Sequence, residues 1–177
     1  ADALCADGSS MVTEFIYWSD YYNSIISPFY SYSTGRTKET LRSSQVTCRD
    51  IDDDGYIEIP EDTSSKKQSS EITSQNWVNY GNTVLSHKCY SFSCKRDGYI
   101  LVIDDDDFSK VKANYDSESR KLTIIDKKNK SNVFEIVTLI NSNYSVNDPK
   151  YKDYTMIMKN SGFVYLAKVN KSSDIDI

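Results

Sequence analysis

Histidine is nearly missing from this sequence, since His87 is the single one among 177 residues. The four cysteines, Cys5, Cys48, Cys89 and Cys94, form no C-x-x-C pair, so no zinc-site spacing is present. No serine lies in the G-x-S-x-G turn that presents a hydrolase nucleophile. His87 also has no acid or nucleophile as a partner in the sequence. We therefore expect no catalytic residue and predict that the protein is not an enzyme.

Positive charge is also scarce, because 26 acidic residues outnumber 21 basic ones and the net charge is −5. No basic stripe runs along the chain, so we expect no nucleic-acid partner. No apolar run approaches the roughly 18 residues of a membrane-spanning helix, so we expect no transmembrane segment. The chain opens on Ala1 without the features of a signal peptide, and we expect it to be the trimmed form of something longer. Membrane anchoring through a missing N-terminus stays open.

One acidic stretch, residues 50–61, has a spacing that dictates a chemistry. Calcium takes roughly six to eight oxygen ligands at flexible distances. Carboxylates at every second position can aim several oxygens at one ion, and Gly55 follows where the backbone must bend and we expect a Cβ to clash. We expect Ile57 to pin this loop to a core. The predicted calcium ligands are Asp50, Asp52, Asp54, the carbonyl of Tyr56, Glu58 and Glu61.

The composition of this stretch fits the EF-hand pattern D-x-D-x-D-G-x5-E, but its flanks do not. Residues 42–48 favour a strand, and residues 60–70 are polar without a helical period. Strand, loop and strand in this order resemble the D-x-D-x-D-G-x-x-[DE] loops of FG-GAP and VCBS-type repeats. That resemblance implies that Glu58, at the ninth position, matters more than Glu61 at the twelfth. The alternative is an acidic surface turn, in which Asp and Gly serve turn geometry alone.

The first 94 residues have the composition of a small antiparallel sheet, comparable to one propeller blade. Such a blade needs cover from a neighbour or a second domain. We expect residues 1–10 to be a loose lead-in and residues 61–75 to be a mobile surface loop. The predicted strands are rich in β-branched and aromatic residues and cover 11–18, 21–26, 42–48, 57–59, 77–80 and 83–93.

The residue composition and patterning change after residue 94, so we predict two domains, 1–94 and 95–177. Carboxylates at residues 104–107 favour the start of a short helix, and residues 110–115 form either part of that helix or a strand. We expect a helical turn near Pro149 and a closing hairpin that turns at residues 160–162. The other predicted strands are 98–103, 122–126, a central one at 133–140, 154–158 and 163–169. The predicted fold class is α+β, mainly β.

The even number of cysteines leaves the disulfide state open, because four cysteines allow three pairings. Cys89 and Cys94 flank a short segment and could bridge a tight turn. Cys5 and Cys48 would then tie the N-terminus to the acidic loop. Free buried thiols are an equal alternative.

The motifs together resemble an uncharacterised group of secreted or lipid-anchored proteins from Firmicutes. Residues 48–60 carry its signature C-R-D-I-x-x-D-G-x-I-E-I-P closely. Gly98-Tyr99 and Phe163-Val164-Tyr165 match the start and end of that group's second domain. Phe108 stands where the group has Trp, so this half is degenerate. The resemblance implies a cell-envelope or extracellular location and an α+β second domain, and it implies no activity.

We therefore expect a non-enzymatic envelope or secreted module with calcium as a structural ion and an unknown protein or glycan partner. One alternative is a carbohydrate-binding module that uses exposed tyrosines together with Trp18 and Trp77. Another is a hydrolase with a site between the domains. Residues 104–107 could hold a second cation, but consecutive carboxylates diverge, so we interpret them as a solvated helix start.

Overall fold

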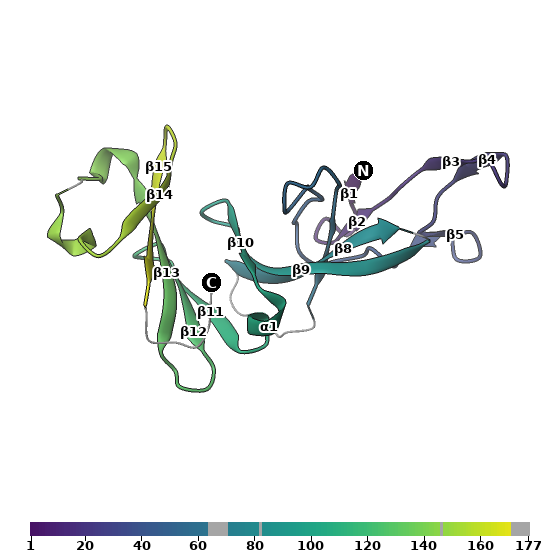
Figure 1. Cartoon of the computed structure of the whole chain (residues 1–177). Coiled ribbons are helices and arrows are strands. Elements are labelled where there is room, and N and C mark those ends of the chain that lie inside the picture. Colours follow the sequence, from purple (N-terminus) through teal and green to yellow (C-terminus); the bar gives the residue numbers. More distant parts are fainter. Residues whose placement is uncertain (64–70, 82, 146, 171–177) are drawn as a thin grey trace. The chain divides into compact units, whose positions relative to one another are not determined.

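The computed structural model describes residues 1–63, 71–81, 83–145 and 147–170 (Figure 1). Strands account for 51% and helices for 6% of the structure. The predicted fold class, α+β and mainly β with small antiparallel sheets, is confirmed. No helix within the described ranges is long and apolar enough to cross a membrane.

The described residues divide into two compact units. The first unit comprises 1–63, 74–81 and 83–91, and the second comprises 71–73, 92–145 and 147–170. This division differs from the predicted one after residue 94. Ile72 and Phe92 explain the difference, because both are buried in the core of the second unit although they begin or end long strands.

The first unit is built from short antiparallel pairs. β7 (Ile59–Asp62) pairs with β8 (Ile72–Gly81), with Ile59 opposite Val78. These two residues and Phe29 form a small core, against which Phe15 and Tyr80 pack. The remaining pairs are β1 (Asp2–Leu4) with β2 (Met11–Thr13), β3 (Tyr17–Ser19) with β4 (Ser24–Ile26), and β5 (Tyr30–Ser31) with β6 (Arg36–Thr37).

Several predictions for the first unit are wrong. Residues 1–10 are not loose, because β1 pairs with β2 in register. Residues 42–48 form no strand, since their only ladder contact is the isolated bridge between Arg42 and Met11. The expected loop at 61–75 contains the end of β7 and the start of β8, while 64–70 lie outside the described residues. The polar composition of residues 61–75 conceals β7 and β8, each of which has buried residues.

A buried arginine, in place of a bridge between Cys5 and Cys48, ties the N-terminus to the segment before the acidic loop. The Arg42 guanidinium donates to the Asp2 carboxylate at 2.7 Å and to the Thr13 hydroxyl at 2.9 Å. Asp2 also accepts the backbone N–H of Cys48 at 2.9 Å. Burial by itself would raise the pKa of Asp2, but hydrogen bonds from Thr13, Arg42 and Cys48 outweigh it and lower this pKa to about 2.

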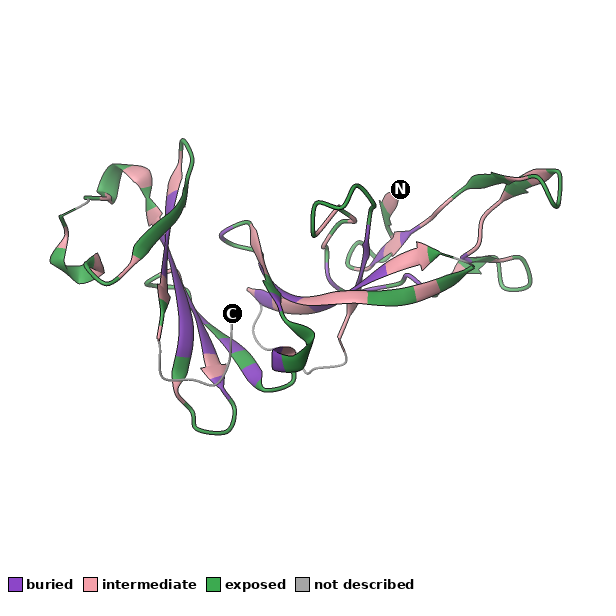
Figure 2. Ribbon diagram, in the orientation of Figure 1, coloured by how far each residue is buried: buried purple, intermediate pink, exposed green. Residues whose placement is uncertain are grey.

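The second unit holds a five-stranded antiparallel sheet in the order β11-β12-β13-β15-β14, and β10 (Tyr99–Ile103) lies next to β9 (Val84–Cys94). The prediction that residues 133–140 form the central strand is confirmed, since β13 lies in the middle and is almost entirely buried (Figure 2). The five strands are β11 (Val111–Asp116), β12 (Lys121–Asp126), β13 (Asn132–Ile140), β14 (Thr155–Lys159) and β15 (Phe163–Val169).

Helical structure in the described part of the second unit is short. The predicted helix start is confirmed: the Asp104 carboxylate caps α1 (Asp105–Phe108) by accepting the N–H of Asp106 at 3.0 Å. The alternative that 110–115 form a strand is the correct one. The turn near Pro149 is also confirmed as η2 (Pro149–Tyr151), and another short turn is η1 (Asn141–Asn143).

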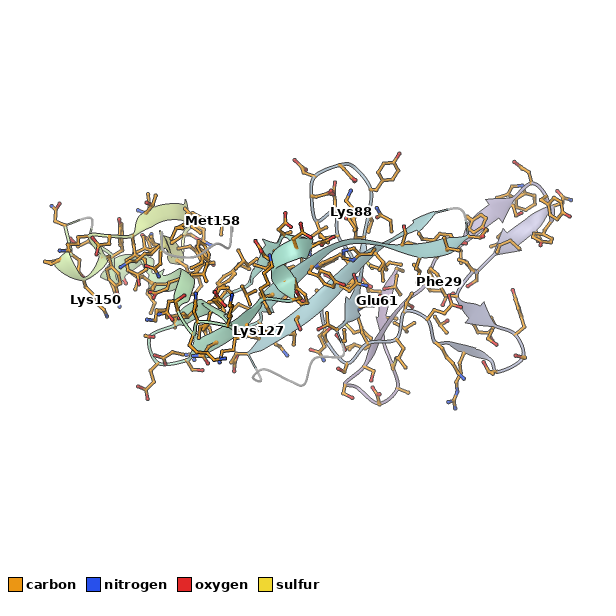
Figure 3. All side chains as sticks on the ribbon, turned by 60° about the horizontal axis from the view of Figure 1, so that its bottom comes forward. Phe29, Glu61, Lys88, Lys127, Lys150 and Met158 are labelled. Carbon is orange, nitrogen blue, oxygen red and sulfur yellow. The ribbon has the colours of Figure 1, made fainter. Side chains whose placement is uncertain are left out.

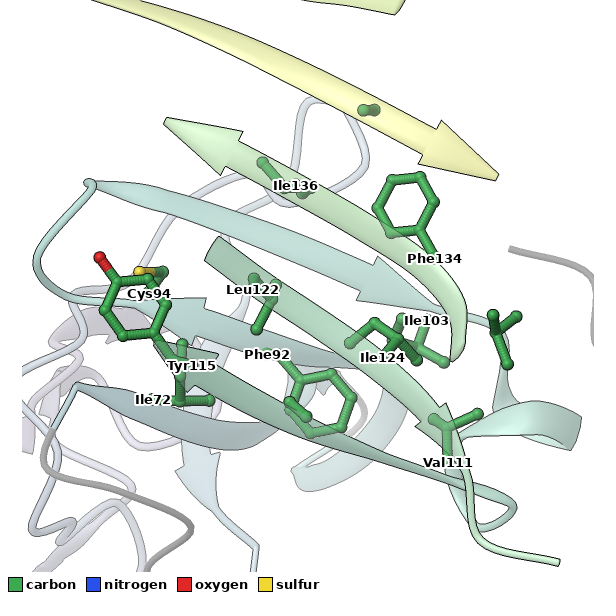
Figure 4. Packing of buried hydrophobic residues seen from close by; sticks show 13 residues of the cluster. Ile72, Phe92, Cys94, Ile103, Val111, Tyr115, Leu122, Ile124, Phe134 and Ile136 are labelled. Carbon is green, nitrogen blue, oxygen red and sulfur yellow. The ribbon is translucent and has the colours of Figure 1, made fainter. Parts of the chain in front are cut away.

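Apolar side chains from several strands make the core of the second unit, including Phe92, Leu122 and Ile124 (Figure 4). One charged residue is buried beside them. Asp97 accepts hydrogen bonds from Arg120 Nε at 2.8 Å and from the Tyr115 hydroxyl at 2.7 Å. The pairing satisfies a carboxylate that burial would otherwise destabilise.

The cysteines do not form the predicted bridges. Cys5, Cys48 and Cys94 are free thiols. Cys94 lies in the same continuous strand as Cys89, where a bridge would have needed a turn. The Cys48 thiol instead contacts Thr13 Oγ1 and Asp2, and burial raises its pKa to about 11. The alternative of free thiols therefore holds for these three, but only Cys94 is also buried as that alternative expected.

Candidate metal centre

The acidic loop is closed at its base by a single bridge between Arg49 and Glu58. The N–H of Glu58 donates to the Arg49 carbonyl at 2.9 Å, and the Arg49 N–H donates back at 3.2 Å. β7 begins one residue after Glu58. The predicted strand after the loop is therefore present but shifted, and the one before it is reduced to this bridge.

Carboxylates shape the backbone inside the loop. Asp50 accepts the N–H of Asp54 at 3.0 Å and the N–H of Gly55 at 2.8 Å. Asp54 accepts the N–H of Tyr56 at 2.9 Å. Gly55 has a φ of +89°, and a Cβ there would meet nothing within 4 Å. The expected clash is thus wrong; this position favours glycine because of its dihedral angle.

Glu58 carries the most informative carboxylate of the loop, because its side chain is completely buried. Its Oε2 accepts the N–H of Ile51 at 2.9 Å. Its Oε1 is buried and has no hydrogen-bond partner among the residues that the structure describes. A buried carboxylate oxygen without a partner is costly and calls for a positive ligand.

Asp50, Asp52 and Glu58 converge, and they are the one such acidic or His/Cys group within the described ranges. One carboxylate oxygen from each lies within 4.8 Å of the others. Like charges at this distance repel by about 1 kcal/mol or more, depending on how much water screens them. An all-oxygen set without histidine or thiolate suits a hard cation such as calcium or magnesium.

A lysine from outside the loop also reaches it. Lys88, labelled in Figure 3, lies on β9. Its Nζ is 2.7 Å from Asp52 Oδ2 and 2.6 Å from Asp54 Oδ2. The hydrogen bonds to Asp52 and Asp54 raise the pKa of Lys88, and the bond from Lys88 lowers the pKa of Asp54. Sequence reasoning missed Lys88, because it is 34 residues from Asp54 and depends on the position of another strand.

The other two predicted carboxylates do not belong to the converging group. Asp54 is paired with Lys88. The residue whose carbonyl is predicted as a ligand, Tyr56, donates its N–H to Asp54 at 2.9 Å. Glu61 is on β7, where it accepts a hydrogen bond from the Asn76 amide at 2.8 Å. Ile57 is 51% exposed, so the expectation that it pins the loop is wrong. Ile59, the residue after Glu58, is completely buried and anchors the loop instead.

The acidic residues 104–107 and His87, which the sequence offered as further site residues, make hydrogen bonds and an ion pair within the protein. Asp104 caps α1, and the Asp107 carboxylate pairs with the Lys110 ammonium at 2.7 Å. His87 Nδ1 is hydrogen-bonded to the Asn76 amide oxygen. Residues 104–107 thus serve a helix start, as predicted.

Comparison of the chain with protein-family models, with curated proteins and with solved structures found no match. The resemblance to secreted Firmicutes proteins therefore stays a prediction. The geometry of the acidic loop is the evidence on which a function can be argued.

Proposed function

We propose that the chain is a non-enzymatic module, secreted or held at the cell surface, whose acidic loop binds a structural calcium ion. The observation that carries the proposal is Glu58 Oε1, a fully buried oxygen without a partner in the described structure, beside converging oxygens of Asp50 and Asp52. A divalent cation would satisfy this oxygen and offset the repulsion among three carboxylates.

The residues present fit calcium better than a smaller ion. Asp50, Asp52 and Glu58 supply three carboxylates from a loop whose own hydrogen bonds fix two of them. Magnesium demands near-ideal octahedral geometry and gives up its water reluctantly, whereas calcium tolerates irregular oxygen sets. Calcium is plentiful outside cells, which suits a site with few protein ligands and supports an extracellular setting.

Thermal melting in calcium and in EDTA tests this proposal. We expect calcium to raise the melting temperature of the wild-type protein and magnesium at equal concentration to raise it less. Asp52→Ala should lower the melting temperature in calcium and change it little in EDTA. Equal loss in both solutions would show that Asp52 stabilises the loop without an ion, and would count against the proposal.

Exposed aromatic side chains on the β3–β4 hairpin favour a second candidate function, carbohydrate binding. Trp18 is 58%, Tyr21 88% and Tyr22 68% exposed, and the hairpin is largely solvent-facing (Figure 2). The Trp18 indole N–H donates to Asp20 at 3.1 Å, which places a polar group beside the ring. Sugars bind such surfaces by stacking a face on an aromatic ring while their hydroxyls find polar partners.

Tryptophan fluorescence tests whether the β3–β4 hairpin binds a carbohydrate. Trp77 is completely buried and bonded to Ser91, so a sugar added to the solution should change the emission of Trp18 alone. Trp18→Ala should abolish the change, whereas Tyr56→Ala, which removes another exposed ring, 72% exposed, from the acidic loop, should not. A blank glycan array at high protein concentration would contradict carbohydrate binding.

A further inference from the structure

We infer that Lys88 is a built-in competitor of the calcium ion: its ammonium must leave Asp52 when the cation binds, so this lysine sets the calcium concentration at which the loop is filled. The inference rests on the proposed calcium site and adds its regulation. The competition follows because Asp52 has two roles. Asp52 belongs to the three converging carboxylates, and it also lies 2.7 Å from Lys88 Nζ.

The ammonium and a divalent cation cannot share this carboxylate at low cost. Both are positive, and both draw on the same Asp52 carboxylate. Lys88 also bridges to Asp54 at 2.6 Å, so it neutralises part of the loop from the side of β9. A cation bound to Asp52 would meet this positive charge close by, and the repulsion would weaken its binding.

Lys88 can leave without a change in the backbone. It lies on β9, outside the loop, and its side chain is 28% exposed. A lysine has a flexible four-carbon stem and a strongly hydrated head, so rotation into water restores its solvation. The lysine therefore plays two opposite parts: it stabilises the acidic loop before calcium binds, and it opposes calcium binding.

Calorimetric titration of calcium into wild-type protein and Lys88→Met tests the competition. We expect Lys88→Met to bind calcium on the order of three- to tenfold more tightly, since two partly exposed ion pairs with the competitor are gone. The same variant should melt at a lower temperature than wild type in EDTA, because the carboxylates have lost their counter-charge. Lys38→Met, which removes an exposed lysine of the same unit, should resemble wild type in both measurements.

Nuclear magnetic resonance gives a readout that needs no variant of the loop. With lysines labelled at Cε, the Lys88 signal, identified by its loss in Lys88→Met, should move on calcium addition toward the position of a solvated lysine. An unmoved signal at saturating calcium would overturn the inference.

The outcomes separate this inference from the proposed function. If wild type and Lys88→Met bind calcium equally, or the variant binds more weakly, Lys88 is no competitor while the calcium site stands. If only Lys88→Met binds, the competition is stronger than expected and the inference holds. If neither protein binds calcium, the proposed function fails and this inference fails with it.

Discussion

Gly55 and Glu58 lie three residues apart in the acidic loop and are fixed by different physical constraints. Gly55 adopts a φ of +89°, which an L-residue with a Cβ rarely adopts. Glu58 is set by burial: one of its oxygens accepts the Ile51 N–H, and the other has no hydrogen-bond partner in the described structure. The first constraint concerns the backbone and holds with or without an ion. The second concerns charge and depends on what is bound.

Gly55→Ala should destabilise the protein by about 1 to 2 kcal/mol through its dihedral angle alone. Gly81→Ala is a matched control, because a Cβ at either glycine meets nothing within 4 Å and only Gly55 has a positive φ. Urea unfolding in EDTA measures the difference without any contribution from calcium. A loss of the same size in both variants would show that the dihedral angle is not the cause.

Among the secondary-structure elements, β1 is held to the first unit by the Asp2 carboxylate as well as by its pairing with β2. The Arg42 guanidinium that binds Asp2 is fully buried, and the Asp2 carboxylate compensates its positive charge. Asp7, in the turn between the two strands, also has a pKa lowered to about 2, by hydrogen bonds from Ser10 and Ser9. Asp7 is exposed, so water screens its contacts.

The free energy of unfolding should therefore depend on pH through the titration of Asp2. Its folded-state pKa lies below the ordinary value of 3.8, so its contribution is complete above that value and is lost as the pH falls from about 5 toward 2. Because water reaches part of the carboxylate, we expect a loss on the order of 1 kcal/mol. Asp2→Asn should flatten this pH dependence of urea unfolding, and Asp7→Asn should change it less. Equal flattening by both would contradict the assignment.

At the scale of the whole molecule, the described chain forms two units with separate apolar cores. Every described contact of the acidic loop, including those to Lys88, lies within the first unit. Calcium should therefore stabilise one part of the chain selectively. Unspecific screening of the net charge of −5 would instead act on all of it.

Hydrogen exchange followed by mass spectrometry should show this selectivity. We expect calcium to slow amide exchange in peptides from residues 49–58 and from the part of β9 around Lys88. Peptides from β11 to β15 should exchange at an unchanged rate. Sodium chloride at equal ionic strength is the control. A uniform change over both units, or the same change with sodium chloride, would argue against a localised ion site.

The second unit could be predicted from the sequence far better than the first. Its strands are long and apolar, as in β13, and its turns carry clear signals, such as Asn160, whose side chain accepts two backbone N–H groups. The first unit contains six strands of only two or three residues, β1 to β6, below the length at which alternation is informative. The end of β7 and the start of β8 have a different cause for the wrong loop prediction, which is their polar composition.

The spacing of the acidic loop predicted six ligands, which include the three carboxylates that converge. The resemblance to FG-GAP and VCBS-type loops ranked Glu58 above Glu61. The sequence could not reveal that Glu58 is buried. In a regular strand, Ile57 and Ile59 would share one face and Glu58 would lie on the other. In the structure Glu58 and Ile59 are both buried and Ile57 is exposed. Nor could the sequence reveal Lys88, whose contact depends on where β9 runs. Local spacing predicts which carboxylates can converge, whereas long-range strand pairing decides which basic residue contacts them.

Calcium titration by calorimetry on Glu58→Gln and Glu61→Gln tests the central claim most directly. Both changes are isosteric, both sites can still accept their present hydrogen bonds, and only Glu58 belongs to the converging group. The account predicts that Glu58→Gln loses most of the calcium affinity, at least tenfold, while its stability in EDTA is kept, and that Glu61→Gln binds like wild type. Unchanged binding by Glu58→Gln, or a greater loss in Glu61→Gln, would contradict the account and leave residues 50–61 as an acidic turn.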